Sequence, residues 1–259
     1  MRYKAITIAL VFLASLTCMS GAFAATEDLA TVQKKAEAGD AVAQFTLGRM
    51  YDKGEGAEQN YTEALKWYTK AAKQGDTKAQ TNLGFMYADG RGVKQNFTES
   101  VKWYQKAATK GDMMAQTNLA ASYSEGQGVK KSPAQAAKWY RKAAEQGSAF
   151  AQNKLGLMYA RSEGGGVKHD DTEAVKWFQK SADQGLAEGQ HDLAVMFEEG
   201  RGVKQDYAEA AKWYLRAANQ NYHYSQNNLG WLYARGQGVP KDRGESVKWF
   251  KKASNNKPK

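Results

Sequence analysis

The chain has 259 residues, with 37 lysines and arginines against 27 aspartates and glutamates, a net charge of +10 and a single cysteine. One cysteine excludes an intramolecular disulfide and a metal site built from several cysteines. The basic excess is spread along the chain and is not concentrated in a stripe with stacking aromatic residues, so no nucleic-acid partner is expected.

Residues 1–24 have the features of a secretory signal peptide. Arg2 and Lys4 precede the apolar run 5–16, and a small-x-small sequence ends at Ala24. We expect cleavage after Ala24 and a periplasmic or secreted protein. The apolar run is too short to span a bilayer, so no stable membrane insertion is expected.

Two alternatives for the leader stay open. It could be retained as an N-terminal anchor, or the chain could be lipidated at Cys18. Thr17 argues against lipidation, because it is bulkier than the residues that usually precede a lipidated cysteine.

After the leader, the same text recurs with a nearly constant period. A Lys-Trp pair returns six times, and its tryptophans are separated by 36, 36, 38, 36 and 36 residues. Periods of this length indicate stacked supersecondary units. The two extra residues fall in the turn 161–166, and insertions in repeats map to loops. The tryptophans are Trp67, Trp103, Trp139, Trp177, Trp213 and Trp249.

Each period contains the pattern of two helices. In the second period, Ala79, Leu83 and Tyr87 are spaced four residues apart and predict a first helix with one apolar face. Further on, Trp103 and Ala107 belong to the apolar stripe of a second helix whose other side carries lysines. We therefore expect leucines of the first helix and aromatic residues of the second to form the core.

The second helix is preceded in every period by a capping residue with Glu or Gln three positions later. This arrangement predicts a capping box, in which each of the two side chains bonds to the other residue's backbone amide. The pairs are Asn60/Glu63, Asn96/Glu99, Ser132/Gln135, Asp170/Glu173, Asp206/Glu209 and Asp242/Glu245.

The expected organisation is a signal peptide at 1–24, an N-terminal capping helix at 25–39, six repeats within 40–254 and a basic tail at 255–259. The capping helix is half a repeat without the Trp-Tyr pair, as expected of a terminal unit of a stacked array. The repeats are placed at 40–75, 76–111, 112–147, 148–185, 186–221 and 222–254.

These motifs resemble a known repeat family. The A-x-x-x-L-G-x-x-Y first helix, the G-x-G-V turn and the A-x-K-W-Y-x-K-A-A second helix are similar to the Sel1-like repeat, a relative of the tetratricopeptide repeat. The resemblance covers nearly all of residues 28–254. It implies an all-α fold, a right-handed solenoid superhelix of antiparallel helix pairs whose first helices line a concave surface. It also implies an adaptor or protein-binding role without one fixed activity.

No catalytic residue, metal or cofactor is expected. The Gly-x-Gly sequences recur between helices and lack the Gly-Lys-Ser/Thr of a phosphate loop, so they are interpreted as turns. His169, His191 and His223 lie at three different repeat positions, without metal-ligand spacing. The one Ser-x-x-Lys, at 254–257, lies in the tail without a Lys-Thr-Gly partner.

Function is therefore expected where the repeats differ, at first-helix positions off the core stripe. These positions hold a mixed aromatic and polar set, which suits the hot spots of a protein interface. The predicted partner-binding residues are Asn82, Phe85, Asn118, Phe150, Leu157, His191, Tyr224, Asn228 and Trp231.

Two repeat positions in this set have a specific rationale. The three asparagines share one position, where their carboxamides could pair with an extended peptide, or could simply be soluble residues. Phe85, Leu157 and Trp231 share another, where exposure would attract a partner and burial would mean packing between repeats.

The partner is expected to be a protein. Exported proteins that the chain resembles suggest three roles: immunity against a secreted lipase effector toxin, binding of host secretory immunoglobulin, or regulation of an envelope sensor kinase. The contrasting classes are a cell-wall or β-lactam-related hydrolase and a structural scaffold of an envelope export complex. The oligomeric state stays open, because only a short tail follows Trp249 and Phe250.

Overall fold

The computed structural model describes residues 28–162 and 166–257. These residues form thirteen α-helices and no strand. The predicted signal peptide, its cleavage site and Cys18 lie outside the described residues, as do 25–27 of the capping helix, 163–165 of the long turn and the end of the tail. The helices are α1 (Leu29–Glu37), α2 (Ala41–Lys53), α3 (Tyr61–Lys73), α4 (Thr77–Asp89), α5 (Phe97–Thr109), α6 (Met113–Glu125), α7 (Pro133–Glu145), α8 (Ala149–Arg161), α9 (Asp171–Asp183), α10 (Ala187–Glu199), α11 (Tyr207–Asn219), α12 (His223–Arg235) and α13 (Arg243–Asn255).

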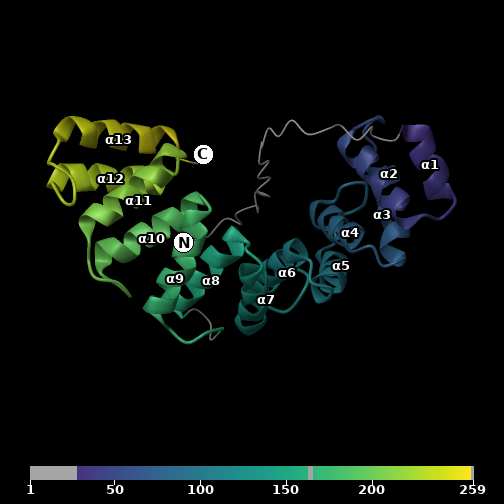
Figure 1. Ribbon diagram of the computed structural model, residues 1–259, viewed down its shortest axis with the longest axis horizontal. Coiled ribbons are helices and arrows are strands. Elements are labelled where there is room, and N and C mark those ends of the chain that lie inside the picture. The colour runs from purple at the N-terminus through teal and green to yellow at the C-terminus, as the bar shows by residue number, and fades with distance from the viewer. Residues whose placement is uncertain (1–27, 163–165, 258–259) are drawn as a thin grey trace.

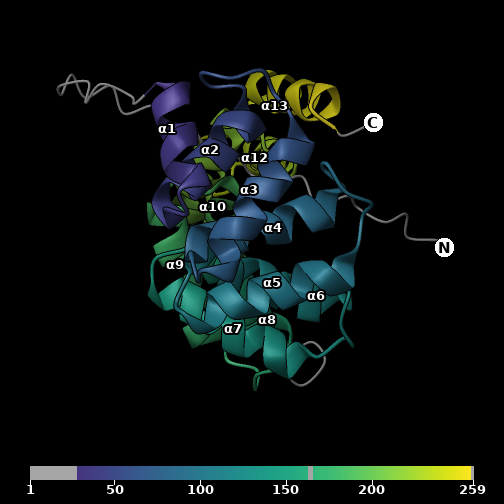
Figure 2. The ribbon, with the colours of Figure 1, turned by 90° about the vertical axis from the view of Figure 1, so that its right-hand side faces the viewer.

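The helices follow one another along an arc (Figure 1). Each even-numbered helix from α2 to α12 pairs with the helix after it, and α1 covers the N-terminal end by packing on α2. Viewed from the side, the helices turn progressively along the array, from the upright α1 to the more horizontal α6 (Figure 2). The expected all-α solenoid of six helix pairs with an N-terminal half-repeat is confirmed.

The first helices of neighbouring repeats lie on the inner side of the arc. Contacts that skip a helix join α4 to α6 and α8 to α10, which are all first helices. Elements on the inside of a curve approach one another more closely than those outside. The hollow of the arc is therefore lined by first helices, as the family resemblance implied.

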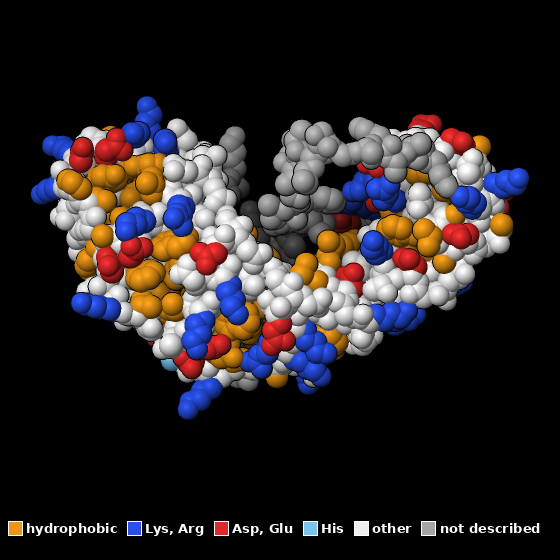
Figure 3. Space-filling model, in the orientation of Figure 1, with side chains coloured by type: hydrophobic (Ala, Val, Ile, Leu, Met, Phe, Trp, Pro, Cys, Tyr) orange, Lys and Arg blue, Asp and Glu red, His pale blue; other side chains and the backbone are white. Residues whose placement is uncertain are grey.

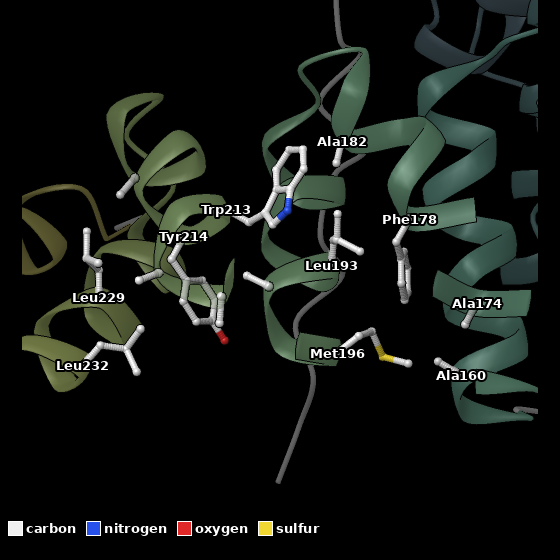
Figure 4. Packing of buried hydrophobic residues seen from close by; sticks show 14 of the residues in the cluster. Ala160, Ala174, Phe178, Ala182, Leu193, Met196, Trp213, Tyr214, Leu229 and Leu232 are labelled. Carbon is white, nitrogen blue, oxygen red and sulfur yellow. The ribbon is translucent and has the colours of Figure 1, made fainter. Parts of the chain in front are cut away.

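The core consists of successive hydrophobic clusters along the array. Each cluster fills the space between the two helices of a pair and the space between that pair and its neighbour. The six first-helix leucines are 0–1% exposed: Leu47, Leu83, Leu119, Leu155, Leu193 and Leu229. Figure 4 shows Leu193 between Phe178 and Trp213, with Tyr214 and Leu229 continuing the same cluster. Five of the six repeat tryptophans are buried, and Trp103 is partly buried. The predicted core is confirmed.

The capping residues act as predicted, but the reciprocal half of the capping box is wrong. Asn96 accepts the backbone N–H of Glu99, for example. The N–H of Asn96 itself bonds to the carbonyl of Tyr87 in the first helix. Since that donor is already satisfied, Glu99 bonds instead to Lys102 one turn later. The backbone of the cap residue thereby also joins the start of the second helix to the first helix of the pair.

A buried glutamine at position 4 of every first helix joins neighbouring elements. Its Nε2 donates to a carbonyl in the last turn of the preceding helix, as Gln116 does to Ala108 over 3.1 Å. In every repeat except that of Gln80, a side chain 30 or 32 residues later donates to its Oε1, as Gln146 does to Gln116 over 2.7 Å. The glutamines are Gln44, Gln80, Gln116, Gln152, Gln190 and Gln226, all 0–6% exposed.

Candidate binding surface

Each first helix presents one stripe of side chains to the hollow of the arc. Positions 2, 6, 9 and 13 of these helices are four, three and four residues apart, so they share one face. In α4 they are Lys78, Asn82, Phe85 and Asp89. We call the six sets together the concave stripe. Of the nine predicted partner-binding residues, all but His191, which occupies position 5, lie on it.

The concave stripe exposes large apolar side chains in two of its repeats. Met114 is 54% exposed in the third repeat, and Tyr224 and Trp231 are 57% and 48% exposed in the last repeat. Hydrophobic side chains flanked by basic ones are visible in the hollow (Figure 3). Exposed apolar patches rimmed by polar residues are a usual mark of an interaction surface.

Three predicted site residues are used largely for internal packing. Phe85, Phe150 and Leu157 are only partly exposed and pack against the core clusters. Phe85 meets the ring of Tyr104 edge-on, with centroids 5.5 Å apart. At the same repeat position, Trp231 is 48% exposed.

The three asparagines are half-buried and are not equivalent. Asn118 donates to the carbonyl of Met114 in its own helix over 2.8 Å. Asn228 donates to the hydroxyl of Tyr214 over 2.9 Å. Asn82 lies beside the hydroxyl of Tyr68. A ladder of identical free carboxamides is therefore not present, and recognition of a peptide through them stays a prediction.

A pocket of about 260 Å³ opens at the N-terminal end of the concave stripe. Its apolar walls include Phe85, Met86 and Met114, contributed by α4 and α6. At its rim, Arg91 pairs with Asp89 over 3.0 Å. We call it the N-terminal pocket. It joins two predicted site residues, Asn82 and Phe85, to several that were not predicted.

The other end of the stripe carries a cluster of aromatic rings. The ring of His191 lies 5.2 Å from that of Tyr222 and 6.1 Å from that of Tyr224. Its Nδ1 lies 2.9 Å from the hydroxyl of Ser225. Burial lowers the pKa of His191 to about 4, assisted by the nearby His223, so the ring is neutral at physiological pH.

Beside this cluster, burial raises the pKa of Asp192 to about 6. The carboxylate accepts a 2.6 Å hydrogen bond from Nδ2 of Asn153, which favours ionisation but does not offset the desolvation. Asp192 lies on the concave stripe at the position held by asparagine in three of the other five repeats.

Sequence reasoning missed Tyr68, Met114 and Tyr222 as parts of these sites. Met114 could have been included, because it lies on the same stripe as the chosen residues. Tyr68 belongs to the predicted core stripe, and nothing in its own repeat indicates that its hydroxyl reaches a pocket. Tyr222 stands before a first helix, where periodicity gives no signal.

No group of three or more His, Cys, Asp or Glu side chains suited to a metal ion occurs in the described part of the chain. None of the helices within 28–162 and 166–257 has the length and apolar character needed to cross a bilayer.

Comparison with known proteins identifies the repeats. The model of the Sel1 repeat family matches residues 41–76, 77–112, 114–148, 149–186, 187–222 and 223–257. A search of curated proteins returned no match.

Among solved structures, a protective antigen of uropathogenic Escherichia coli strains, which displays an SLR fold, is 37% identical with a TM-score of 0.84 over 89% of this chain. The match covers 49% of that antigen, so this chain spans about half its length. A Sel1 repeat protein from Oxalobacter formigenes is 35% identical with a TM-score of 0.75, covering 89% of this chain and 94% of that one. An immunity protein from Pseudomonas aeruginosa shares the fold at 21% identity, with a TM-score of 0.50 and coverage of 83% and 81%.

Proposed function

The chain belongs to the Sel1 repeat family, and from this premise we propose that it is an exported, non-enzymatic adaptor that binds a partner protein on its concave stripe. Repeats of this family generally serve as scaffolds for protein interactions. The export is proposed from the leader sequence, and the binding face from the exposed side chains of the first helices.

The observation that carries the proposal is the exposure of large apolar side chains on one inner face. Tyr224 and Trp231 are exposed on α12 and Met114 is exposed on α6, although both helices also have a buried face. Aromatic side chains ringed by polar groups are the usual anchors of protein interfaces. Arg235 lies over the Trp231 ring at 5.1 Å and supplies such a polar border.

An affinity capture tests the proposal. The wild-type protein and the variant Phe85→Ala/Asn118→Ala/Trp231→Ala are immobilised side by side and exposed to periplasmic extract and culture medium. A partner retained by the wild type and lost from the variant supports binding through the concave stripe. Equal retention of every protein by both would contradict it.

A matched control truncates exposed apolar residues on second helices. Leu215 on α11 and Val247 on α13 are 39% and 58% exposed. The variant Leu215→Ala/Val247→Ala is expected to retain the partner. Circular dichroism of all variants separates lost binding from lost folding.

The identity of the captured protein distinguishes the finer roles. A secreted lipase would make the chain an immunity protein, which is also the stated role of the Pseudomonas aeruginosa structure that shares its fold. A sensor-kinase domain would make it an envelope regulator, and secretory immunoglobulin a host-binding protein. Several envelope proteins retained together would favour a structural scaffold. Covalent labelling by a penicillin would favour the hydrolase and overturn the non-enzymatic assignment.

A further inference from the structure

The N-terminal pocket contains an unsatisfied hydrogen-bond donor. Tyr68 lines the pocket but has no exposed surface, and its hydroxyl has no hydrogen-bond partner within the described residues. Burial raises the pKa of this hydroxyl, so it keeps its proton at physiological pH. Leaving a buried donor unpaired is costly, so such a group calls for an explanation.

The repeat architecture shows what is missing. Tyr214 occupies the same repeat position as Tyr68, and its hydroxyl donates to Glu198 over 2.5 Å and accepts from Asn228 over 2.9 Å. The equivalents of these two partners around Tyr68 are Asp52 and Asn82. Asp52 is one methylene shorter than Glu198, and although it lies close enough to raise the pKa of Tyr68, it does not meet hydrogen-bond geometry with the hydroxyl. Within the described residues, the Tyr68 proton therefore lacks a well-placed acceptor oxygen.

The surroundings restrict what could supply that oxygen. Arg49 and Arg91 at the pocket are already paired with acidic residues, Glu55 at 3.8 Å and Asp89 at 3.0 Å. A ligand carboxylate would also meet the negative charge of Asp52, and the third cation that lines the pocket, Lys53, already has an interaction of its own. An ammonium or guanidinium group carries no acceptor at all. A neutral carbonyl beside an apolar group satisfies both the hydroxyl and the walls.

We propose that the N-terminal pocket binds one apolar side chain of an extended segment of the partner protein, whose adjoining peptide carbonyl accepts the proton of Tyr68. The carboxamide of Asn82 bonds to the same peptide group. The apolar side chain lies among Phe85, Met86 and Met114, and flexible methionines adapt readily to the shape of a ligand. The volume, about 260 Å³, lies below the roughly 300–1,000 Å³ of small-molecule pockets and suits a single side chain.

This inference rests on the proposed function and adds to it the chemistry of one contact. It is tested without the natural partner. The protein is labelled with ¹³C at methionine methyl groups and titrated with the blocked peptide acetyl-Gly-Ala-Leu-Ala-Gly-amide, while peptides with Lys or Glu in place of Leu serve as probes of charge. The methyls of Met86 and Met114 report on the pocket, and those of Met158 and Met196 report on the rest of the array.

The leucine peptide is expected to shift the Met86 and Met114 signals in a saturable way, without shifting Met196. Tyr68→Phe, which removes only the hydroxyl, is expected to weaken binding by about three- to tenfold. No shift at Met86 and Met114 overturns the proposal. Tighter binding of the lysine or glutamate peptide overturns the assigned chemistry and indicates a charged side chain of the partner in its place.

Two further variants use the comparison between repeats. Asp52→Glu copies the repeat that contains Tyr214 and supplies an internal acceptor, so it is expected to weaken peptide binding while raising the melting temperature. Glu198→Asp makes the opposite change away from the pocket and is expected to leave peptide binding unchanged. Unaltered binding by Asp52→Glu, in a variant whose melting temperature rises, contradicts the role of the Tyr68 proton.

The outcomes are separable from those of the affinity capture. A partner captured through the concave stripe, together with no peptide binding at the pocket, removes only this inference. If the peptide binds at the pocket but no partner is captured through the stripe, the assignment of the pocket stands. The wider adaptor function is then contradicted.

Discussion

Lys110 stands where four other repeats carry a glutamine, and Oε1 of the buried Gln80 is left without a hydrogen-bond partner in the described structure. The ammonium of Lys110 donates instead to the carbonyl of Gly75 over 2.8 Å. In the next repeat, Gln146 donates to Gln116 and closes the same link. The second repeat therefore lacks the hydrogen bond that joins the start of its first helix to the end of its second helix.

Lys110→Gln is expected to stabilise the protein by about 1 kcal/mol, because it supplies the missing donor to a buried acceptor. Urea denaturation followed by circular dichroism measures the change. Lys94→Gln removes the same charge from an exposed turn residue and serves as the control. An equal gain in both variants would attribute the effect to charge removal.

Sequence periodicity predicted the architecture because the same helix and turn signals recur in six repeats. Apolar spacing, capping residues and helix-terminal glycines all agreed, and agreement between levels specifies one fold. The hydrogen bonds of the buried glutamines were not predicted. A glutamine that recurs beside an alanine in every first helix gives no sign in the sequence of whether its side chain is buried. Its role depends on a side chain thirty residues away.

The binding surface was predicted less well than the fold, for a related reason. The spacing of the concave stripe follows from helix geometry, and its use as a binding surface stays a prediction. Exposure along it depends on what neighbouring repeats present, so Phe85 packs inward whereas Trp231 at the same position is exposed. The unpaired hydroxyl of Tyr68 depends on the length of one side chain, Asp52, which periodicity does not resolve.

Two tryptophans are expected to differ sharply in their contribution to stability. Trp139 is 5% exposed, and Trp139→Ala should cost about 3–5 kcal/mol. Trp231 is 48% exposed and meets Phe250 edge-on at 5.2 Å, so Trp231→Ala should cost about 1 kcal/mol. Chemical denaturation of both variants measures the difference. Equal losses would show that Trp231 is a core residue, which would weaken its assignment as a binding anchor.

The second glycine of the Gly-x-Gly turn is expected to be irreplaceable for two reasons. Gly128 has φ of +69°, and a Cβ there would lie 2.1 Å from the carbonyl oxygen of Phe97 in the preceding repeat. Gly128→Ala should therefore destabilise by well over 1 kcal/mol, since backbone cannot move aside as a side chain can. Thermal melting measures the loss.

Gly111→Ala is the matched control for that substitution. Gly111 also has a positive φ, +96°, but a Cβ there would meet nothing within 4 Å. Gly111→Ala therefore has only the conformational cost of a positive φ, and it should destabilise the protein less than Gly128→Ala. A loss equal to that of Gly128→Ala would mean that the close approach between repeats contributes nothing.

Asp192 and Asp171 are expected to affect the pH dependence of stability in opposite directions. Burial raises the pKa of Asp192 to about 6, above its value of about 3.9 in the unfolded chain. The folded state therefore binds more protons between these pH values, and the ionised carboxylate destabilises the protein above pH 6. Asp192→Asn should stabilise on the order of 2–3 kcal/mol at pH 7.5, a gain that disappears toward pH 3.5 because both side chains are then neutral.

Asp171 serves as the control, because its pKa is lowered and its carboxylate is expected to stabilise the protein at neutral pH. The hydrogen bonds and charge of Arg201, at 2.7 Å and 3.2 Å, lower the pKa of Asp171, so this carboxylate stabilises above its unfolded pKa and that stability is lost as pH falls through the folded pKa. Asp171→Asn should therefore destabilise at pH 7.5, with a loss that also diminishes in acid. Urea denaturation of both variants and the wild type at pH 7.5 and 3.5 measures the two differences. A loss of stability in Asp192→Asn at pH 7.5 would mean that the bond from Asn153 outweighs desolvation, and that the Asp192 carboxylate is ionised and stabilising on the concave stripe.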